Sequence, residues 1–194
     1  MIKRLALAFS CLFLFVSLHA QNIDIDILKS INPSDPNSGF WKATGQSGYF
    51  LPAGLAAGTI GYGILSKDKP LREKGYELVL SMGISAIITQ SLKYTIDRTR
   101  PADKYPNDVF VDKPVHGKSF PSGHTTIAFA AATTVTLQYK KWYIAVPAYL
   151  WAGATGYSRM YAGEHYPSDV LAGAAVGIGS AYLAHWISGK IFGK

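Results

Sequence analysis

Five apolar segments, joined by polar connections, constrain the fold of this chain more than any other feature. They cover residues 49–66, 78–92, 125–139, 142–157 and 170–187. Each is close to the length of about 17 residues that a helix needs to cross a membrane. None has the alternating pattern of a strand, so we predict an all-α helical bundle associated with a membrane. A soluble helical bundle is the alternative, because its buried helices can have a similar composition.

Small residues recur at a spacing of four in two of these segments. The pairs are Gly54 with Gly58 and Gly173 with Gly177. In a membrane, this spacing lets two helix backbones approach closely. The sequence therefore predicts tight helix contacts at both pairs.

The composition excludes several classes of protein. Hydrophobic residues make up 48% of the chain and charged residues 16%, against about 25% charged in an average globular domain, which excludes a disordered chain. The single cysteine, Cys11, excludes an intramolecular disulfide framework. The net charge of +7 comes from cations without a basic run or an aromatic recognition motif. We therefore expect no nucleic-acid partner.

The positions of the cations predict an orientation in a membrane. They gather in the connection 67–74, at residues 140–141 and after the fifth apolar segment. If every segment crosses the membrane once, these three places share one side, which the positive-inside rule makes cytoplasmic. The connections 93–124 and 158–169 then share the opposite, periplasmic face.

The N-terminus predicts how the chain is divided. Two basic residues precede an uninterrupted apolar stretch at 5–18, and Ala20 is the small residue that signal cleavage requires. We predict a signal peptide over 1–20, with an uncleaved first transmembrane helix as the alternative. Residues 21–47 are rich in turn formers and are expected to be a polar, loop-like segment. Residues 48–194 are predicted to form the functional domain.

Three short motifs lie in the two connections on the predicted periplasmic face. In the first, Lys93 and Arg100 are seven residues apart, which on a continuing helix places them on one face about 10 Å apart. Pro101 ends that helix.

In the second motif, Ser122 can cap the helix that follows, and Gly123 lets a ligand approach the backbone. The N–H groups at such a helix start attract an anion.

The third motif supplies a histidine that a carboxylate can hold. Asp169 follows His165 by four residues, so its carboxylate can reach one ring nitrogen. The other nitrogen can attack phosphorus, while His124 can donate a proton to the leaving oxygen. Arg159 joins the two cations of the first motif as a ligand for phosphoryl oxygens. Glu164 matches no metal-site pattern, so the motifs predict a phosphate site without a metal.

Taken in order, the motifs Lys-x6-Arg-Pro, Pro-Ser-Gly-His and Ser-Arg-x5-His-x3-Asp resemble the signature of the type 2 phosphatidic acid phosphatase (PAP2) family. The resemblance extends over residues 49–187. It implies five or six membrane-associated helices, with residues 5–18 as the first of six, and a reaction without metal or cofactor. It also implies that His165 forms a phosphohistidine, that Asp169 orients it, and that His124 is the general acid and later activates water. The residues expected to hold the phosphoryl group are Lys93, Arg100, Ser122, Gly123 and Arg159.

The expected function is hydrolysis of a lipid phosphate monoester or diphosphate at the cell inner membrane, with the site facing the periplasm. The lipids considered are phosphatidic acid, phosphatidylglycerol phosphate, a polyprenyl diphosphate and a lipid A phosphate. The alternatives are a soluble periplasmic acid phosphatase, a vanadium-dependent haloperoxidase and a non-catalytic lipid-binding protein. The sequence specifies no single lipid and no oligomeric state.

Overall fold

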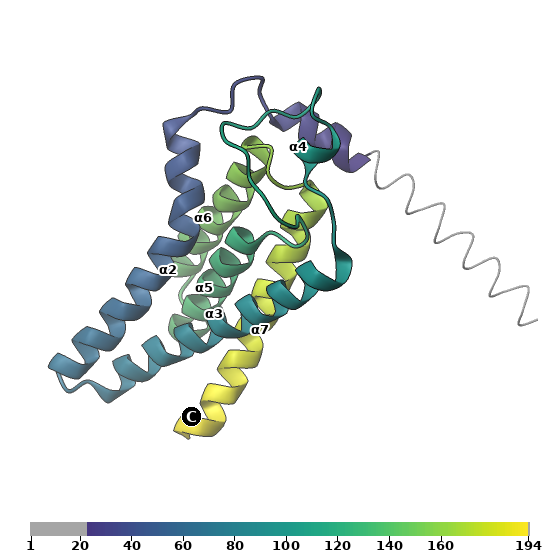
Figure 1. The fold of residues 1–194 in the computed structure, drawn as a ribbon. Coiled ribbons are helices and arrows are strands. Elements are labelled where there is room, and N and C mark those ends of the chain that lie inside the picture. Colours follow the sequence, from purple (N-terminus) through teal and green to yellow (C-terminus); the bar gives the residue numbers. More distant parts are fainter. Residues whose placement is uncertain (1–22, 194) are drawn as a thin grey trace, which may run out of the picture.

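The computed structural model describes residues 23–193, and within them it is all-helical, with no strand. Residues 23–31 form a first short helix. The elements that follow are α2 (Gly39–Leu65), α3 (Lys69–Ile96), α4 (Pro101–Lys104), α5 (Gly123–Tyr139), α6 (Trp142–Tyr161) and α7 (Pro167–Phe192). The predicted all-α fold class is confirmed: the five long helices of the described part form one bundle, with the long loops at one end (Figure 1).

The helices extend beyond the apolar segments because polar residues start them. The Ser38 hydroxyl accepts a hydrogen bond from the Trp41 N–H, and α2 begins at Gly39. Asp68 accepts from the Leu71 N–H in the same way at the start of α3, a common capping arrangement. The expectation of a loop over residues 21–47 was therefore wrong, since two stretches of it are helical.

The short helix 23–31 is stabilised by contacts that its own sequence pattern does not reveal. Ile25 and Leu28 are buried in a cluster with Val109 and Tyr166, which come from distant parts of the chain. An isolated helix of this length is marginal in water, so tertiary packing is what stabilises it. The cluster places the helix over the loop end of the bundle.

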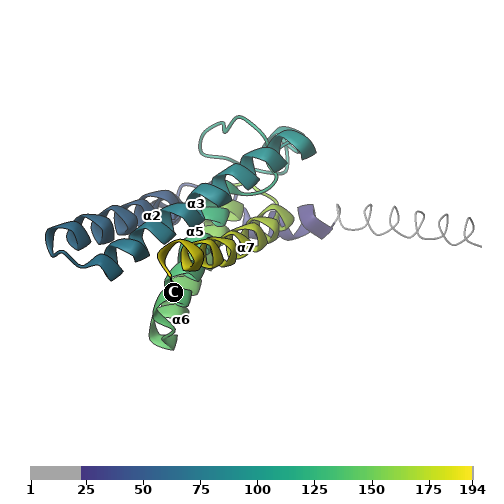
Figure 2. The same ribbon diagram turned by 90° about the horizontal axis from the view of Figure 1, so that it is seen from below.

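Helix α5 is the centre of the bundle and packs against α2, α3, α6 and α7. In the view of Figure 2, α2 and α3 run side by side, while α6 crosses them at a steep angle. The buried side chains between these helices are mostly small or hydroxylated, including Ser81, Ser85, Thr125, Thr126, Thr134, Thr155 and Ser180. Large apolar side chains point outward instead, including Phe50, Leu65, Ile87, Leu150 and Leu171.

One of the two predicted glycine pairs makes a close helix contact. A Cβ at Gly177 would lie 2.3 Å from the Thr126 carbonyl oxygen, and a Cβ at Gly173 would lie 2.8 Å from that of Ser122. The prediction is confirmed for this pair, which joins α7 to α5. It was wrong for Gly54 and Gly58, because both lie on the outward face of α2. A Cβ added at either position would have no neighbour within 4 Å.

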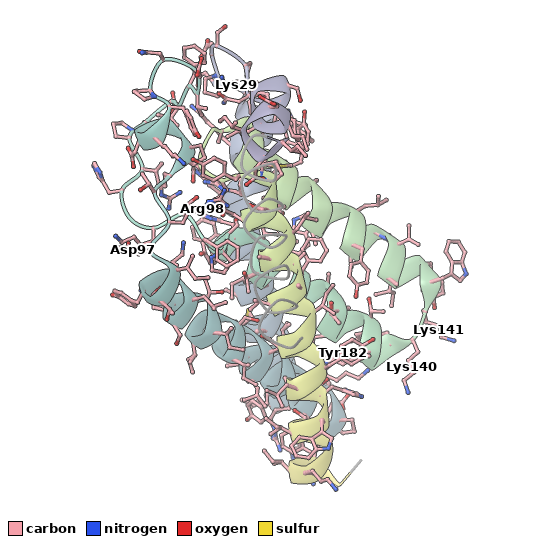
Figure 3. The ribbon with its side chains drawn as sticks, turned by 90° about the vertical axis from the view of Figure 1, so that its right-hand side faces the viewer. Lys29, Asp97, Arg98, Lys140, Lys141 and Tyr182 are labelled. Carbon is pink, nitrogen blue, oxygen red and sulfur yellow. The ribbon has the colours of Figure 1, made fainter. Side chains whose placement is uncertain are left out.

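Two helices of the described part, α2 and α7, are long and apolar enough to cross a membrane, with mean hydropathies of 1.2 and 1.5. Their composition is consistent with a membrane location. The three cationic places lie at the end of the bundle opposite the long loops, with Lys140 and Lys141 at the α5–α6 turn (Figures 1 and 3). For the described residues, this arrangement agrees with the prediction of a shared side, and the cytoplasmic location of that side stays a prediction. The predicted signal peptide or first helix lies outside the described residues.

Candidate active site

The loop end of the bundle brings the three motifs together from four long helices. Lys93 lies in the last turn of α3, and Arg159 in the last turn of α6. Gly123 is the first residue of α5. His165 precedes α7, and Asp169 lies in its first turn. Residues far apart in the sequence thus share one end of the fold (Figure 1).

The first motif does not lie on one continuous helix. Helix α3 ends at Ile96, because Asp97 adopts a left-handed conformation with φ of 51°. The expectation that Lys93 and Arg100 share a helical face was therefore wrong. Arg100 instead has an extended backbone in front of Pro101, as that proline predicts, and its side chain reaches the third motif by way of the loop.

Arg100 and Lys93 are both fixed by backbone carbonyls. Arg100 donates from Nε to the Gly117 carbonyl at 3.2 Å and from Nη1 to the Glu164 carbonyl at 3.0 Å. Lys93 donates from Nζ to the Lys118 carbonyl at 2.6 Å. Among the described residues, no carboxylate forms an ion pair with Lys93, and Arg100 has one only at 3.9 Å, from Glu164. Cations with such weak carboxylate pairing favour an incoming anion.

His165 lies between a carboxylate and a cation. Its Nδ1 is 3.5 Å from Asp169 Oδ2, and its Nε2 is 3.5 Å from Arg100 Nη1. The predicted proximity of His165 and Asp169 is confirmed. The Nδ1 separation is longer than an ordinary hydrogen bond, so the two groups face each other without a formed hydrogen bond. Nε2 is therefore the nitrogen that faces the cations.

Asp169 connects all three motifs, and several of its partners were not anticipated from the sequence. Its Oδ1 accepts from Arg98 Nη1 at 2.6 Å, while its Oδ2 accepts from the Ser119 hydroxyl and from the Tyr166 N–H. Its backbone carbonyl accepts from the Ser122 N–H at 3.0 Å. Arg98 and Ser119 carry no spacing that marks them, so only the folded chain identifies them.

The start of α5 differs in detail from the expected cap. Ser122 is the N-cap residue, as predicted, but its hydroxyl accepts from the Thr125 hydroxyl at 2.9 Å and not from a backbone N–H. The first N–H groups of a helix have no partner within the helix, so those at Gly123 and His124 point out of the α5 start. A Cβ on Gly123 would lie 2.6 Å from the Tyr49 hydroxyl.

Arg159 forms an ion pair that the sequence did not reveal. The Glu164 carboxylate contacts Arg159 Nη2 and lies 3.9 Å from Arg100 Nη1. An internal anion thus occupies the space between two of the predicted phosphate ligands. A Cβ at Gly45 would lie 2.5 Å from Arg159 Nη1, so the backbone of α2 packs closely against the same guanidinium.

A cavity of about 270 Å³ opens onto this cluster. His124, Arg159 and Glu164 line it from the motif side, and Trp41 and Lys42 line it from α2. The His124 ring contacts the Tyr49 ring at a centroid distance of 4.2 Å, with the two planes tilted by 52°. The N-terminal half of α2 is therefore one wall of the site, although its first residues belong to the segment 21–47 that was expected to be a loop.

Comparison with known proteins identifies the family. The profile of the PAP2 superfamily matches residues 74–192, which is more than half of the chain. The chain belongs to the PAP2 superfamily. The match contains all three motifs and begins after the N-terminal helix and α2.

Two relatives of this PAP2 chain have named activities. A lipid A 1-phosphatase of Porphyromonas gingivalis is 37% identical over 135 residues, which are 68% of this chain and 28% of the relative. An undecaprenyl-diphosphatase of Sulfolobus acidocaldarius is 31% identical over 116 residues, 60% of this chain and 56% of the relative. The chain thus spans little more than half of one relative and under a third of the other.

Two solved structures share the PAP2 fold of this chain. LpxE of Aquifex aeolicus has a TM-score of 0.66 and 26% identity, covering 84% of this chain and 94% of that one. A transmembrane PAP2 type phosphatidylglycerolphosphate phosphatase of Bacillus subtilis has a TM-score of 0.72 and 24% identity, covering 98% of both chains. The second likeness concerns the fold alone.

Burial sets the protonation state of His165. His165 is 2% exposed. This burial is the main cause that lowers the pKa of His165 to about 4. The nearby carboxylate of Asp169 opposes the shift, and the charge of Arg100 adds to it. The ring is therefore neutral at pH 7 and keeps a lone pair, as a nucleophile requires.

We predict that the His165 ring stays neutral on lowering the pH from 7 to 5.5 and takes up a proton only near pH 4. The measurement is an NMR titration of ¹⁵N-histidine-labelled protein, with the His165 signals assigned by their loss in His165→Gln. Arg100→Gln should move the midpoint to higher pH, because it removes a cation that disfavours imidazolium. A wild-type midpoint near 6.5 would contradict this prediction.

Proposed function

We propose that this protein is a phosphatase that hydrolyses a lipid phosphate monoester or diphosphate, without a metal, through a phosphohistidine on His165. The observation that carries the proposal is the position of the His165 ring, with Asp169 on Nδ1 and Arg100 on Nε2 at 3.5 Å each. The names of the two curated relatives, a lipid A 1-phosphatase and an undecaprenyl-diphosphatase, support this class of substrate.

In the first step, His165 Nε2 attacks phosphorus, and the bond from phosphorus to the leaving oxygen breaks. His124 acts in its imidazolium form, which the negative charge of the bound phosphate favours, and donates its proton to that oxygen, so that the alcohol or phosphate leaves without excess charge and the His124 ring becomes neutral. Asp169 stabilises the positive charge that forms on the His165 ring. The non-bridging oxygens lie against the cations Lys93, Arg100 and Arg159 and the first N–H groups of α5 beside Ser122 and Gly123, which stabilise the transition state.

In the second step, the neutral His124 takes a proton from water, and the resulting hydroxide attacks phosphorus. The bond between phosphorus and His165 Nε2 breaks, which releases phosphate and restores the free ring. Glu164 must give up Arg159 while phosphate is bound, because the phosphoryl oxygens need the same guanidinium. Its carboxylate pairs with Arg159 again once phosphate has left.

The outer surface of the bundle supports a membrane-embedded enzyme acting on a lipid. Phe50 is 74% exposed, Leu65 84% and Leu150 69%, whereas the helix interfaces are built from small and hydroxylated residues. That distribution suits helices surrounded by hydrocarbon, since close packing of small residues drives their association. We propose that the bundle spans the inner membrane and that the site faces the periplasm, with residues 1–20 as a signal peptide or first helix.

The proposed function predicts that detergent-purified protein releases phosphate from lipid substrates far more efficiently than from a soluble ester. The panel is lipid A, phosphatidic acid, phosphatidylglycerol phosphate, undecaprenyl diphosphate and p-nitrophenyl phosphate, each assayed for inorganic phosphate. We expect kcat/KM for at least one lipid to exceed that for p-nitrophenyl phosphate by about 100-fold, since remote binding energy raises kcat/KM. Equal rates, together with extraction from cells without detergent, would favour a soluble acid phosphatase.

A further inference from the structure

Arg98 lies between two buried carboxylates and is not directed at the phosphate site. Its Nη1 donates to Asp169 Oδ1, and its Nη2 donates to Asp24 Oδ2, each at 2.6 Å. The Tyr166 ring covers the guanidinium at 3.8 Å. Arg98 lies near the upper end of α7, close to the N-terminal helix (Figure 3). One guanidinium thus holds together the first motif, the third motif and a residue of that helix.

Asp24 is itself fixed to the start of α7. It is 7% exposed, and its Oδ1 accepts from the Ser168 N–H at 2.9 Å, while its Oδ2 accepts from the Ser168 hydroxyl at 2.5 Å. A carboxylate at this position satisfies an N–H of the first helical turn and suits the helix dipole. Asp24 therefore orients the turn that carries Asp169 as well as the guanidinium that binds it.

The backbone of Arg98 orients the other oxygen of Asp169. The Arg98 carbonyl accepts from the Ser119 N–H at 2.8 Å, and the Ser119 hydroxyl donates to Asp169 Oδ2. Arg98 thus binds one carboxylate oxygen of Asp169 directly and helps to position Ser119, one of the two donors to the other. Asp169 is fully buried, and a buried carboxylate needs a compensating charge and complete hydrogen bonding to remain ionised and in place.

We propose that Asp24 and Arg98 are positioning residues for the reaction: they hold Asp169 in the one orientation in which it orients His165. This inference rests on the proposed function and extends the catalytic machinery to the helix 23–31, outside the residues 74–192 that the family profile matches. Neither side chain touches the substrate. Both act through Asp169.

The test compares variants that remove the charge of this network with a matched control. Asp24→Asn keeps the shape and removes the charge, while Asp26→Asn makes the same change at an exposed position of the same helix. We expect kcat to fall about 10- to 100-fold in Asp24→Asn and in Arg98→Gln, with KM within about threefold, as for other outer-shell partners of catalytic groups. Arg98→Lys should recover part of kcat, and Asp26→Asn should match the wild type.

A double-mutant cycle separates positioning from a general loss of stability. In an Asp169→Asn background, Asp24→Asn should change kcat less than twofold, because the group through which it acts is already disabled. A merely structural Asp24 would cost the same factor in both backgrounds and would lower the thermal midpoint of unfolding. Equal losses, or an unchanged kcat in Asp24→Asn, would overturn the proposal.

A measurement on the resting protein keeps this inference separate from the proposed function. Because Asp169 Oδ2 faces Nδ1 at 3.5 Å and a carboxylate favours a proton on the nitrogen that it faces, ¹⁵N NMR should show His165 largely as the Nδ1–H tautomer in the wild type and Asp26→Asn. A mixture is expected in Asp24→Asn and Arg98→Gln. If wild-type protein releases no phosphate from any lipid but these spectra differ as described, the proposed function fails and the positioning role stands. Identical spectra in all four proteins would overturn the positioning role.

Discussion

Replacement of His165 by alanine is expected to reduce phosphate release by about 10⁴-fold or more, because it removes the proposed nucleophile and not an auxiliary contact. The cations and the start of α5 remain, so the substrate should still bind with a similar affinity. The measurement is kcat and KM for the best lipid of the panel. The control is His116→Ala, since His116 is exposed in the loop between the first two motifs.

The intermediate gives the same prediction a second readout. Rapid quenching of wild-type protein with ³²P-labelled substrate should give labelled protein, and His165→Ala should give none. His124→Ala should still become labelled from p-nitrophenyl phosphate, whose leaving group needs no acid, but should lose the label slowly because water is no longer activated. Substantial phosphate release by His165→Ala would contradict the assignment of the nucleophile.

Replacement of Gly177 by valine is expected to destabilise the bundle by about 3 kcal/mol or more, at or beyond the upper end of typical overpacking costs. A Cβ at this position would lie 2.3 Å from the Thr126 carbonyl oxygen and 2.8 Å from the Ala130 N. Both atoms belong to the backbone of α5, which packs against four other long helices. A shift of either atom would therefore disturb those helix contacts and cost free energy. The measurement is the midpoint of thermal unfolding in detergent.

Gly179→Val is the matched control for this prediction. Gly179 lies on the same helix, and a Cβ added there would have no neighbour within 4 Å. Valine at this position should therefore change the free energy of unfolding little beyond its effect on helix propensity. It adds apolar surface, which a membrane accepts. If the two variants unfold at the same temperature, the close contact between α5 and α7 is not where the structure places it.

Local pattern was enough to predict the helices of the bundle and the residue types of the site. The apolar runs required helices, and Pro101 was correctly predicted to follow the end of one, since α3 ends at Ile96 and Arg100 is extended. The spacing of His165 and Asp169 also correctly predicted that their side chains would lie together. These features depend on residues within a few positions of one another, and a sequence displays such relations directly.

Other features depended on contacts between distant residues, and the sequence did not reveal them. Gly173–Gly177 and Gly54–Gly58 have the same spacing, but only the first pair faces a neighbouring helix. The helix 23–31 looks like a polar loop until Val109 and Tyr166 cover its apolar face. In both cases, the outcome is decided by what packs against the segment and not by its own composition.

The sequence by itself determined the all-helical class and the side-chain types of the proposed phosphate site, because helical periodicity and side-chain type are local properties. Only the tertiary structure determined the partners of the charged groups. Glu164 pairs with Arg159, and Asp24 and Asp169 share Arg98 across more than 70 residues on either side. A charge can pair with any opposite charge that folding brings within reach, so its partner follows from the packing of the helices and leaves no periodic trace in the chain.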